Sequence, residues 1–135
     1  MRVAAGIVSL SIAAALLVAT LCLAPDTAAQ ENHLLNPPTS AAAMSNPYQG
    51  SKQAAAAGKK LYGQNCAQCH GLTREGMNNA PSLKSKEVRA AKPGALFWFI
   101  TNGDLQKGMP AWSNLPKPQR WEIVTFLQGK TQSRD

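Results

Sequence analysis

The chain has 135 residues, which is room for one small domain once any processing is complete. Its hydrophobic content of 44% is raised by an alanine- and leucine-rich start, so the remaining core is small and would usually need a staple. The net charge of +7 comes from scattered lysines and arginines without interleaved aromatic residues. This pattern argues against nucleic acid as a partner and is compatible with solubility, an acidic protein partner or anionic lipid.

Residues 1–29 have the pattern of a secretory signal peptide. Arg2 supplies a positive start, residues 3–24 are uncharged and mostly apolar, and Thr27-Ala28-Ala29 offers small residues for cleavage after Ala29. An apolar run of this length can also just span a bilayer, so an uncleaved membrane anchor is the alternative. Because positively charged residues stay on the cytoplasmic side of the membrane, Arg2 predicts that the rest of the chain is exported. A bacterial periplasm is the expected compartment.

Residues 30–50 predict an extended or disordered linker. The segment holds Asn36-Pro37-Pro38-Thr39-Ser40 and Ser45-Asn46-Pro47 and shows no amphipathic period. If the N-terminal segment is retained, this linker would tether the following domain to the membrane surface.

Residues 51–132 predict one helical domain. Ser51 is a candidate N-cap for an alanine-rich helix to Gln64, and a short helix is expected from Lys84 to Ala91. Another helix begins at Pro93 and ends at Asn102-Gly103. The last begins at Pro116 or Pro118 and ends at Gln128-Gly129. No segment alternates like a strand, so the predicted class is all-α with long loops.

The motif Cys66-Ala67-Gln68-Cys69-His70 carries the chemistry. In an exported chain, two cysteines at this spacing can form a disulfide, half of a zinc site or two thioether bonds to haem. Zinc is disfavoured because only His33 remains as another nitrogen ligand and no second cysteine pair exists. A thioredoxin-like redox site is disfavoured because no strand pattern precedes the motif.

The histidine directly after Cys69 favours haem. One helical turn would present both sulfurs to the same porphyrin edge, and His70 would offer one ring nitrogen to the iron. The other ring nitrogen needs an acceptor that fixes the ring, and a backbone carbonyl in the following loop is expected.

The second axial ligand of the iron decides the function. His33 and Met44 lie in the predicted linker, and Met77 follows His70 too closely for the chain to wrap around the ring. Met109 lies in Gly108-Met109-Pro110, where glycine gives the backbone freedom to approach the haem and proline fixes the exit. Ligation by Met109 would occupy the second axial position of the iron and leave no site for oxygen or peroxide. Electron transfer is therefore predicted, and enzyme activity is not. If Met109 does not ligate, an open-site haem enzyme or gas sensor is the alternative.

From about Pro47 to Lys130 the sequence resembles a class I c-type cytochrome, with one haem and histidine/methionine ligation. Gly58 and Tyr62 match the N-terminal helix of that family, and Ile123 and Phe126 match its C-terminal helix. The resemblance implies a cytochrome c fold of three to five short helices around one covalently attached haem c. It also implies that Pro81 accepts a hydrogen bond from the ligand histidine, that Leu83 touches the ring and that Tyr62 supports the haem pocket.

A narrower resemblance concerns small cytochromes that accept electrons from periplasmic quinoprotein (PQQ) dehydrogenases. Asn46-Pro47, the segment 58–62, the segment 96–103 and Met109-Pro110-Ala111-Trp112 carry it. It implies a periplasmic carrier of single electrons between an alcohol or sugar dehydrogenase and an acceptor such as an oxidase, with acidic docking surfaces on its partners. The alternative is a membrane-tethered haem subunit of a dehydrogenase or oxidase complex.

Overall fold

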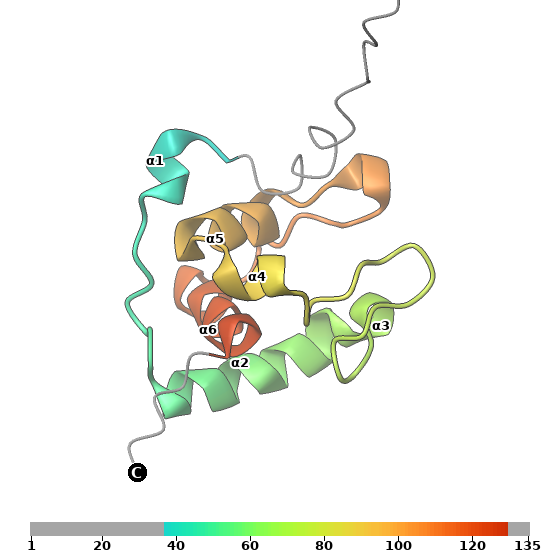
Figure 1. The fold of residues 1–135 in the computed structure, drawn as a ribbon, viewed down its shortest axis with the longest axis horizontal. Coiled ribbons are helices and arrows are strands. Elements are labelled where there is room, and N and C mark those ends of the chain that lie inside the picture. Colours follow the sequence, from blue (N-terminus) through green and yellow to red (C-terminus); the bar gives the residue numbers. More distant parts are fainter. Residues whose placement is uncertain (1–36, 130–135) are drawn as a thin grey trace, which may run out of the picture. The chain divides into compact units, whose positions relative to one another are not determined.

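The computed structural model describes residues 37–129, which contain six α-helices and one 3-10 helix. Within this part of the chain the only β-structure is two isolated bridges, so the predicted all-α class is confirmed. Figure 1 shows the helices in order along the chain. Their bounds are α1 Thr39–Ala42, α2 Lys52–Asn65, α3 Ala67–His70, α4 Lys86–Ala90, α5 Pro93–Asn102, η3 Leu105–Lys107 and α6 Lys117–Gln128.

The helix ends follow local signals in the sequence. The Ser51 hydroxyl accepts from the amide of Ala54 at 3.1 Å and caps α2. Pro93 opens α5, and Gly103 ends it with a φ of 66°. These bounds agree with the sequence prediction to within about two residues, the usual uncertainty of a helix end.

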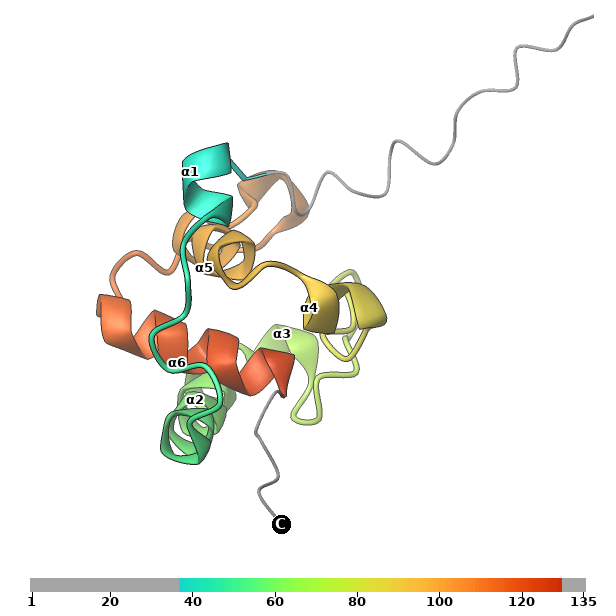
Figure 2. The same ribbon diagram turned by 60° about the vertical axis from the view of Figure 1, so that its left-hand side comes forward.

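Helices α2 and α6 cross at Gly58. A Cβ at this position would overlap the backbone carbonyl of Glu122, so only glycine allows the two backbones to meet so closely. One turn further along, the rings of Tyr62 and Phe126 lie 5.3 Å apart. Figures 1 and 2 both show α6 lying across α2. The Cys66–His70 motif follows α2 directly, so this crossing fixes the position of the motif relative to α6.

Helix α5 covers the other side of α6. The ring of Phe97 stacks on Trp121 with centroids 4.1 Å apart, and Val124 is completely buried between the helices. This core is continuous across α2, α5 and α6. We call these three helices the frame of the domain, and the loops connect them. The buried members of the core are Tyr62, Ala67, Leu96, Phe97, Ile100, Trp121, Ile123, Val124 and Leu127.

Residues 37–50 differ from the predicted extended or disordered linker. They form α1 and a turn, and Gly94 in α5 lacks the side chain that would overlap the Ala41 carbonyl. Asn46 is buried and donates from Nδ2 to the Thr125 hydroxyl at 2.9 Å. Its Oδ1 accepts from the Tyr48 amide at 2.9 Å. A buried amide with these partners costs little to desolvate, so this polar segment packs on the domain.

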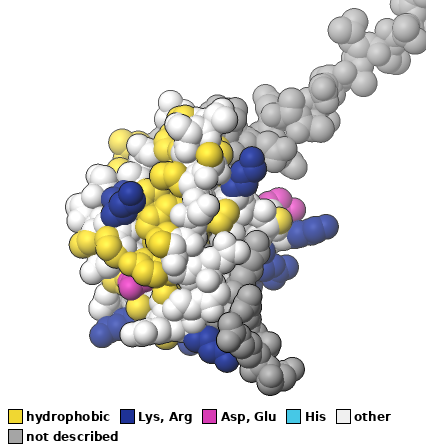
Figure 3. All heavy atoms as spheres, turned by 90° about the vertical axis from the view of Figure 1, so that its left-hand side faces the viewer, with side chains coloured by type: hydrophobic (Ala, Val, Ile, Leu, Met, Phe, Trp, Pro, Cys, Tyr) yellow, Lys and Arg dark blue, Asp and Glu magenta, His cyan; other side chains and the backbone are white. Residues whose placement is uncertain are grey.

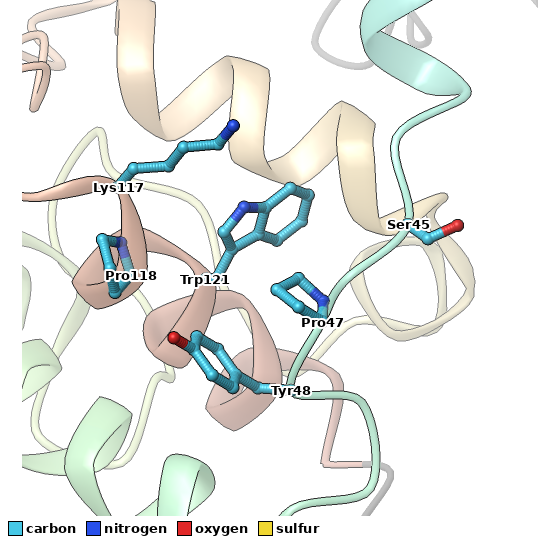
Figure 4. A pocket seen from close by; sticks show the side chains of 6 residues that line it. All are labelled: Ser45, Pro47, Tyr48, Lys117, Pro118 and Trp121. Atoms are coloured by element: carbon cyan, nitrogen blue, oxygen red, sulfur yellow. The ribbon is translucent and has the colours of Figure 1, made fainter.

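The face that carries this segment is shown in Figure 3, where hydrophobic side chains gather in the middle and basic side chains lie around them. An open pocket of about 300 Å³ lies between the segment and the start of α6. In Figure 4, Trp121 lies in the middle of the pocket lining, with Lys117 and Pro118 at its left, Pro47 at its lower right and Tyr48 below it. Trp121 is only 3% exposed, because Phe97 already covers it, and the pocket contains none of the predicted site residues.

Candidate functional site

The Cys66–His70 motif is a single helical turn at the end of α2. Cys66 ends α2 and begins α3, and its carbonyl accepts from the amides of Cys69 at 3.2 Å and His70 at 3.0 Å. This backbone geometry brings the two thiols and the imidazole onto one turn. Cys69 is exposed and Cys66 is half-buried, and both are free thiols. Burial, with a smaller contribution from Cys69, raises the pKa of Cys66 to about 11, so its thiol is protonated at neutral pH.

The His70 ring is buried and held by one backbone carbonyl. Its Nδ1 lies 3.0 Å from the carbonyl oxygen of Pro81, and the side chain is 8% exposed. A carbonyl can only accept, so Nδ1 is the donor in this pair and Nε2 is the ring nitrogen left for a metal. Among the described residues none makes a hydrogen bond to Nε2. This arrangement suits a histidine that gives Nε2 to a metal and fixes its ring through Nδ1.

The loop from residue 71 to 83 is tied to the motif at several points. The Tyr62 hydroxyl donates to the Gly71 carbonyl at 2.6 Å, and the Gly76 amide donates to the His70 carbonyl at 2.9 Å. Leu83 is half-buried against the core, and its amide donates to the Arg74 carbonyl at 2.9 Å. The structure therefore brings Tyr62 and Pro81 to the His70 turn and places Leu83 at the end of the same loop.

Met109 belongs to a different loop. Its amide and carbonyl exchange hydrogen bonds of 2.9 Å with the carbonyl and amide of Asp104, which closes a short hairpin around η3. Gly108 has a φ of 81°, a left-handed conformation that glycine adopts without strain. In Figure 1 this hairpin and α3 both extend on the right-hand side of α5 and α6. No hydrogen bond among residues 37–129 joins the Met109 hairpin to His70.

Sequence reasoning did not single out Arg74. Its guanidinium lies 3.2 Å from the Phe126 carbonyl and 3.3 Å from the Leu127 carbonyl, both at the end of α6. No spacing rule reveals this contact, because the acceptors are backbone atoms more than fifty residues away. The one local sign is structural: Arg74 has a φ of 70°, which is uncommon for a residue other than glycine.

The donor set fits a covalently attached haem. Two thiols and a histidine whose Nε2 has no hydrogen-bond partner within residues 37–129 lie on one turn, and the more accessible thiol, Cys69, is next to His70. Within the described residues no group of three or more His, Cys, Asp or Glu side chains could hold a metal ion. The same residues contain no helix with both the length and the apolar character needed to cross a membrane.

Two c-type cytochromes are among the solved structures that resemble this fold. Cytochrome cL from the marine methylotrophic bacterium Methylophaga aminisulfidivorans is 26% identical, with a TM-score of 0.53 over 62% of this chain and 57% of that one. The c-type cytochrome XoxG from Methylobacterium extorquens is 20% identical, with a TM-score of 0.50 over 58% of this chain and 50% of that one. This chain thus spans only about half the length of either protein. Among curated proteins none matches the chain.

The helical fold and the Cys66–His70 turn define a c-type cytochrome. Residues 53–127 match the family described as cytochrome c oxidase, cbb3-type, subunit III, and the chain belongs to this family. Membership implies haem c as the cofactor and supports electron transfer as the role.

Proposed function

We propose that the chain is a periplasmic carrier of single electrons with one haem c. Thioether bonds would join the haem to Cys66 and Cys69, and His70 and Met109 would be the axial ligands of the iron. The observation that supports this most is the His70 ring, which is buried, held at Nδ1 by Pro81 and, among the residues that the structure describes, without a partner at Nε2, on the same turn as the two thiols.

The haem iron would supply one-electron cycling between the ferrous and ferric states. The chain supplies orientation: Pro81 fixes the plane and tautomer of His70, and the Tyr62 hydroxyl holds the Gly71 carbonyl next to it. Leu83 is half-buried at the end of the loop 71–83 and would contact the porphyrin ring. A thioether from Met109 would favour ferrous iron and close the iron to oxygen, which suits a carrier and not a catalyst.

The redox partners are proposed from charge and resemblance. With a net charge of +7, the chain would associate fastest with proteins that present acidic docking surfaces. Lys84 and Lys107 are exposed on the two loops that carry Pro81 and Met109, so they stand where such a surface would meet the site. The proposed donor is a quinoprotein alcohol or sugar dehydrogenase. Similarity to a cytochrome of a methylotroph, a bacterium that grows on one-carbon compounds, is consistent with a donor of this class.

A second candidate is a haem subunit that stays within an oxidase or dehydrogenase complex. The description of the matching family, which names an oxidase subunit, favours it. The apolar residues 3–24 would anchor such a subunit if the segment is retained. The intact mass of the exported protein separates the two candidates, because a free carrier lacks residues 1–29.

The proposed function is tested on protein exported by a host with a haem-attachment system. We expect a mass increased by one haem that persists after denaturation and a far-red sulfur-to-iron band in the oxidised spectrum. Cyanide and carbon monoxide should bind slowly. Replacing the axial histidine, His70→Ala, should prevent a stable holoprotein. Colourless protein of unmodified mass would refute haem attachment, and rapid cyanide binding without the far-red band would favour an open-site enzyme or sensor.

A further inference from the structure

Arg74 links the loop after the haem motif to the end of α6. Its Nη1 donates to the carbonyls of Phe126 and Leu127 at 3.2 and 3.3 Å, and these are two of the last carbonyls of the helix. The guanidinium carbon also lies 4.6 Å from the centroid of the Phe126 ring. A cation at a helix C-terminus satisfies carbonyls that have no partner inside the helix and complements the helix dipole. The side chain of Arg74 is therefore fixed to the frame of the domain.

The backbone of Arg74 holds the segment that contains Pro81. Its carbonyl accepts from the Leu83 amide at 2.9 Å and from the Ser82 hydroxyl at 3.2 Å. These two residues directly follow Pro81, whose own carbonyl lies 3.0 Å from Nδ1 of His70. Arg74 thus connects α6 to the segment that carries the Pro81 carbonyl.

These contacts form a closed circuit. From His70 it runs through Pro81 and the next two residues to Arg74, and then through Phe126 to Tyr62. It returns to the residue after His70 through the bond from Tyr62 to the Gly71 carbonyl. Arg74 adopts a φ of 70° within this circuit, a strained backbone conformation for a residue other than glycine. The contacts of its guanidinium offset this strain.

We propose that Arg74 is a positioning residue that holds the Pro81 carbonyl on Nδ1 of His70 and so tunes the iron ligand. This inference rests on the proposed function, since it takes His70 as the axial ligand. A firm hydrogen bond from Nδ1 increases the basicity of Nε2, which stabilises ferric iron more than ferrous iron. When Arg74 is lost, the segment after Pro81 is released, the bond weakens and the reduction potential rises.

Charge and position act in opposite directions, so they can be separated. Removing a positive charge near the iron favours the ferric state and lowers the potential. Releasing Pro81 favours the ferrous state and raises it. Arg74→Lys keeps the charge, but its side chain is shorter and lacks the planar guanidinium that lies over Phe126 while Nη1 reaches both carbonyls. Arg74→Asn removes the charge and accepts a positive φ more readily. Arg89→Asn removes the same charge from an exposed position on α4 and is the matched control.

The test is the exchange rate of the His70 Nδ1 proton with solvent, measured by NMR in the reduced holoprotein, together with the reduction potential. We expect exchange at least tenfold faster in Arg74→Lys and Arg74→Asn, unchanged exchange in Arg89→Asn, and a higher potential in Arg74→Lys. Exchange within twofold of the unmodified protein in Arg74→Lys would overturn the proposal. So would equal acceleration of the α5 amides, since Arg74 would then be only a cap for stability.

If Arg74→Asn does not fold, Arg74→Lys decides alone. The experiment distinguishes failure of the proposed function from failure of the role of Arg74. Absence of attached haem in the unmodified protein refutes the proposed function and the role of Arg74 with it. Attached haem with an unaffected Nδ1 proton refutes only the role of Arg74.

Discussion

Gly58 gives the sharpest prediction for stability, because the backbones of α2 and α6 meet there. In Gly58→Ala the new methyl group would overlap the carbonyl of Glu122, and its carbon would lie 3.0 Å from the Ile123 amide nitrogen. Both obstacles are backbone atoms in the middle of a helix, so neither can rotate away as a side chain could. The helices must therefore separate and loosen the contact between Tyr62 and Phe126.

The magnitude follows from two opposing effects. Overpacking of a closely fitted contact costs about 3 kcal/mol, whereas alanine in place of glycine inside a helix gains about 1 kcal/mol. The net expectation is a loss of about 2 kcal/mol in the free energy of unfolding. Gly63 is the matched control, because it lies in the same helix, is exposed and has nothing within 4 Å of an added Cβ. Gly63→Ala should gain about 0.5–1 kcal/mol from helix propensity alone.

The assay is guanidinium chloride unfolding of the holoproteins, followed by far-UV circular dichroism. With a slope of about 3 kcal/mol per M, the two variants should differ in midpoint by about 1 M. Equal midpoints for Gly58→Ala and Gly63→Ala would show that α2 and α6 do not touch at Gly58, and the reasoning would be refuted.

Four further predictions concern the packed segment and the site. Asn46→Ala should cost about 1–3 kcal/mol in denaturant unfolding, because it removes a buried hydrogen-bonded amide; no loss would mean that the segment does not pack on α6. Burial raises the pKa of Tyr62 from 10.0 to about 12, so its contribution to stability is complete below pH 10 and falls as pH rises toward 12. Tyr62→Phe should lack this step in unfolding measured against pH, and the same alkaline loss in both proteins would exclude Tyr62 as its cause. Met109→Ala should leave the haem attached and lower the reduction potential, and an unchanged potential would remove Met109 from the iron. Lys107→Gln should slow electron transfer with an acidic partner at low salt more than Lys52→Gln at the far end of α2, and equal effects in stopped-flow mixing would place the docking surface elsewhere.

The helices of the frame were predictable because their signals are local. Pro93 and Gly103 bracket α5, and Ser51 caps α2, without help from any distant residue. The segment from residue 37 to 50 was not predictable in this way. Its composition is that of a linker, and the burial of Asn46 depends on Thr125, which lies 79 positions later in the chain.

In the candidate site, too, local features were predictable and contacts between distant residues were not. The Cys66–His70 turn lies within five residues, so its spacing alone indicated the chemistry. The pairing of His70 with a carbonyl in the next loop was expected in kind, and only the family resemblance named Pro81. Arg74 could not be singled out because its partners are backbone carbonyls on α6, and every residue of a sequence carries a carbonyl whatever its type.

The packing of residues 37–50 sets the reach of any membrane attachment. Had all of residues 30–50 been free, an anchored domain could have moved about 70 Å from its anchor at roughly 3.4 Å per residue. The packed segment begins at residue 37. If residues 1–29 are retained as an anchor, the seven residues 30–36 can span at most about 25 Å between the anchor and the domain. Such a domain could meet only partners at the bilayer surface, whereas a cleaved one would diffuse through the whole compartment.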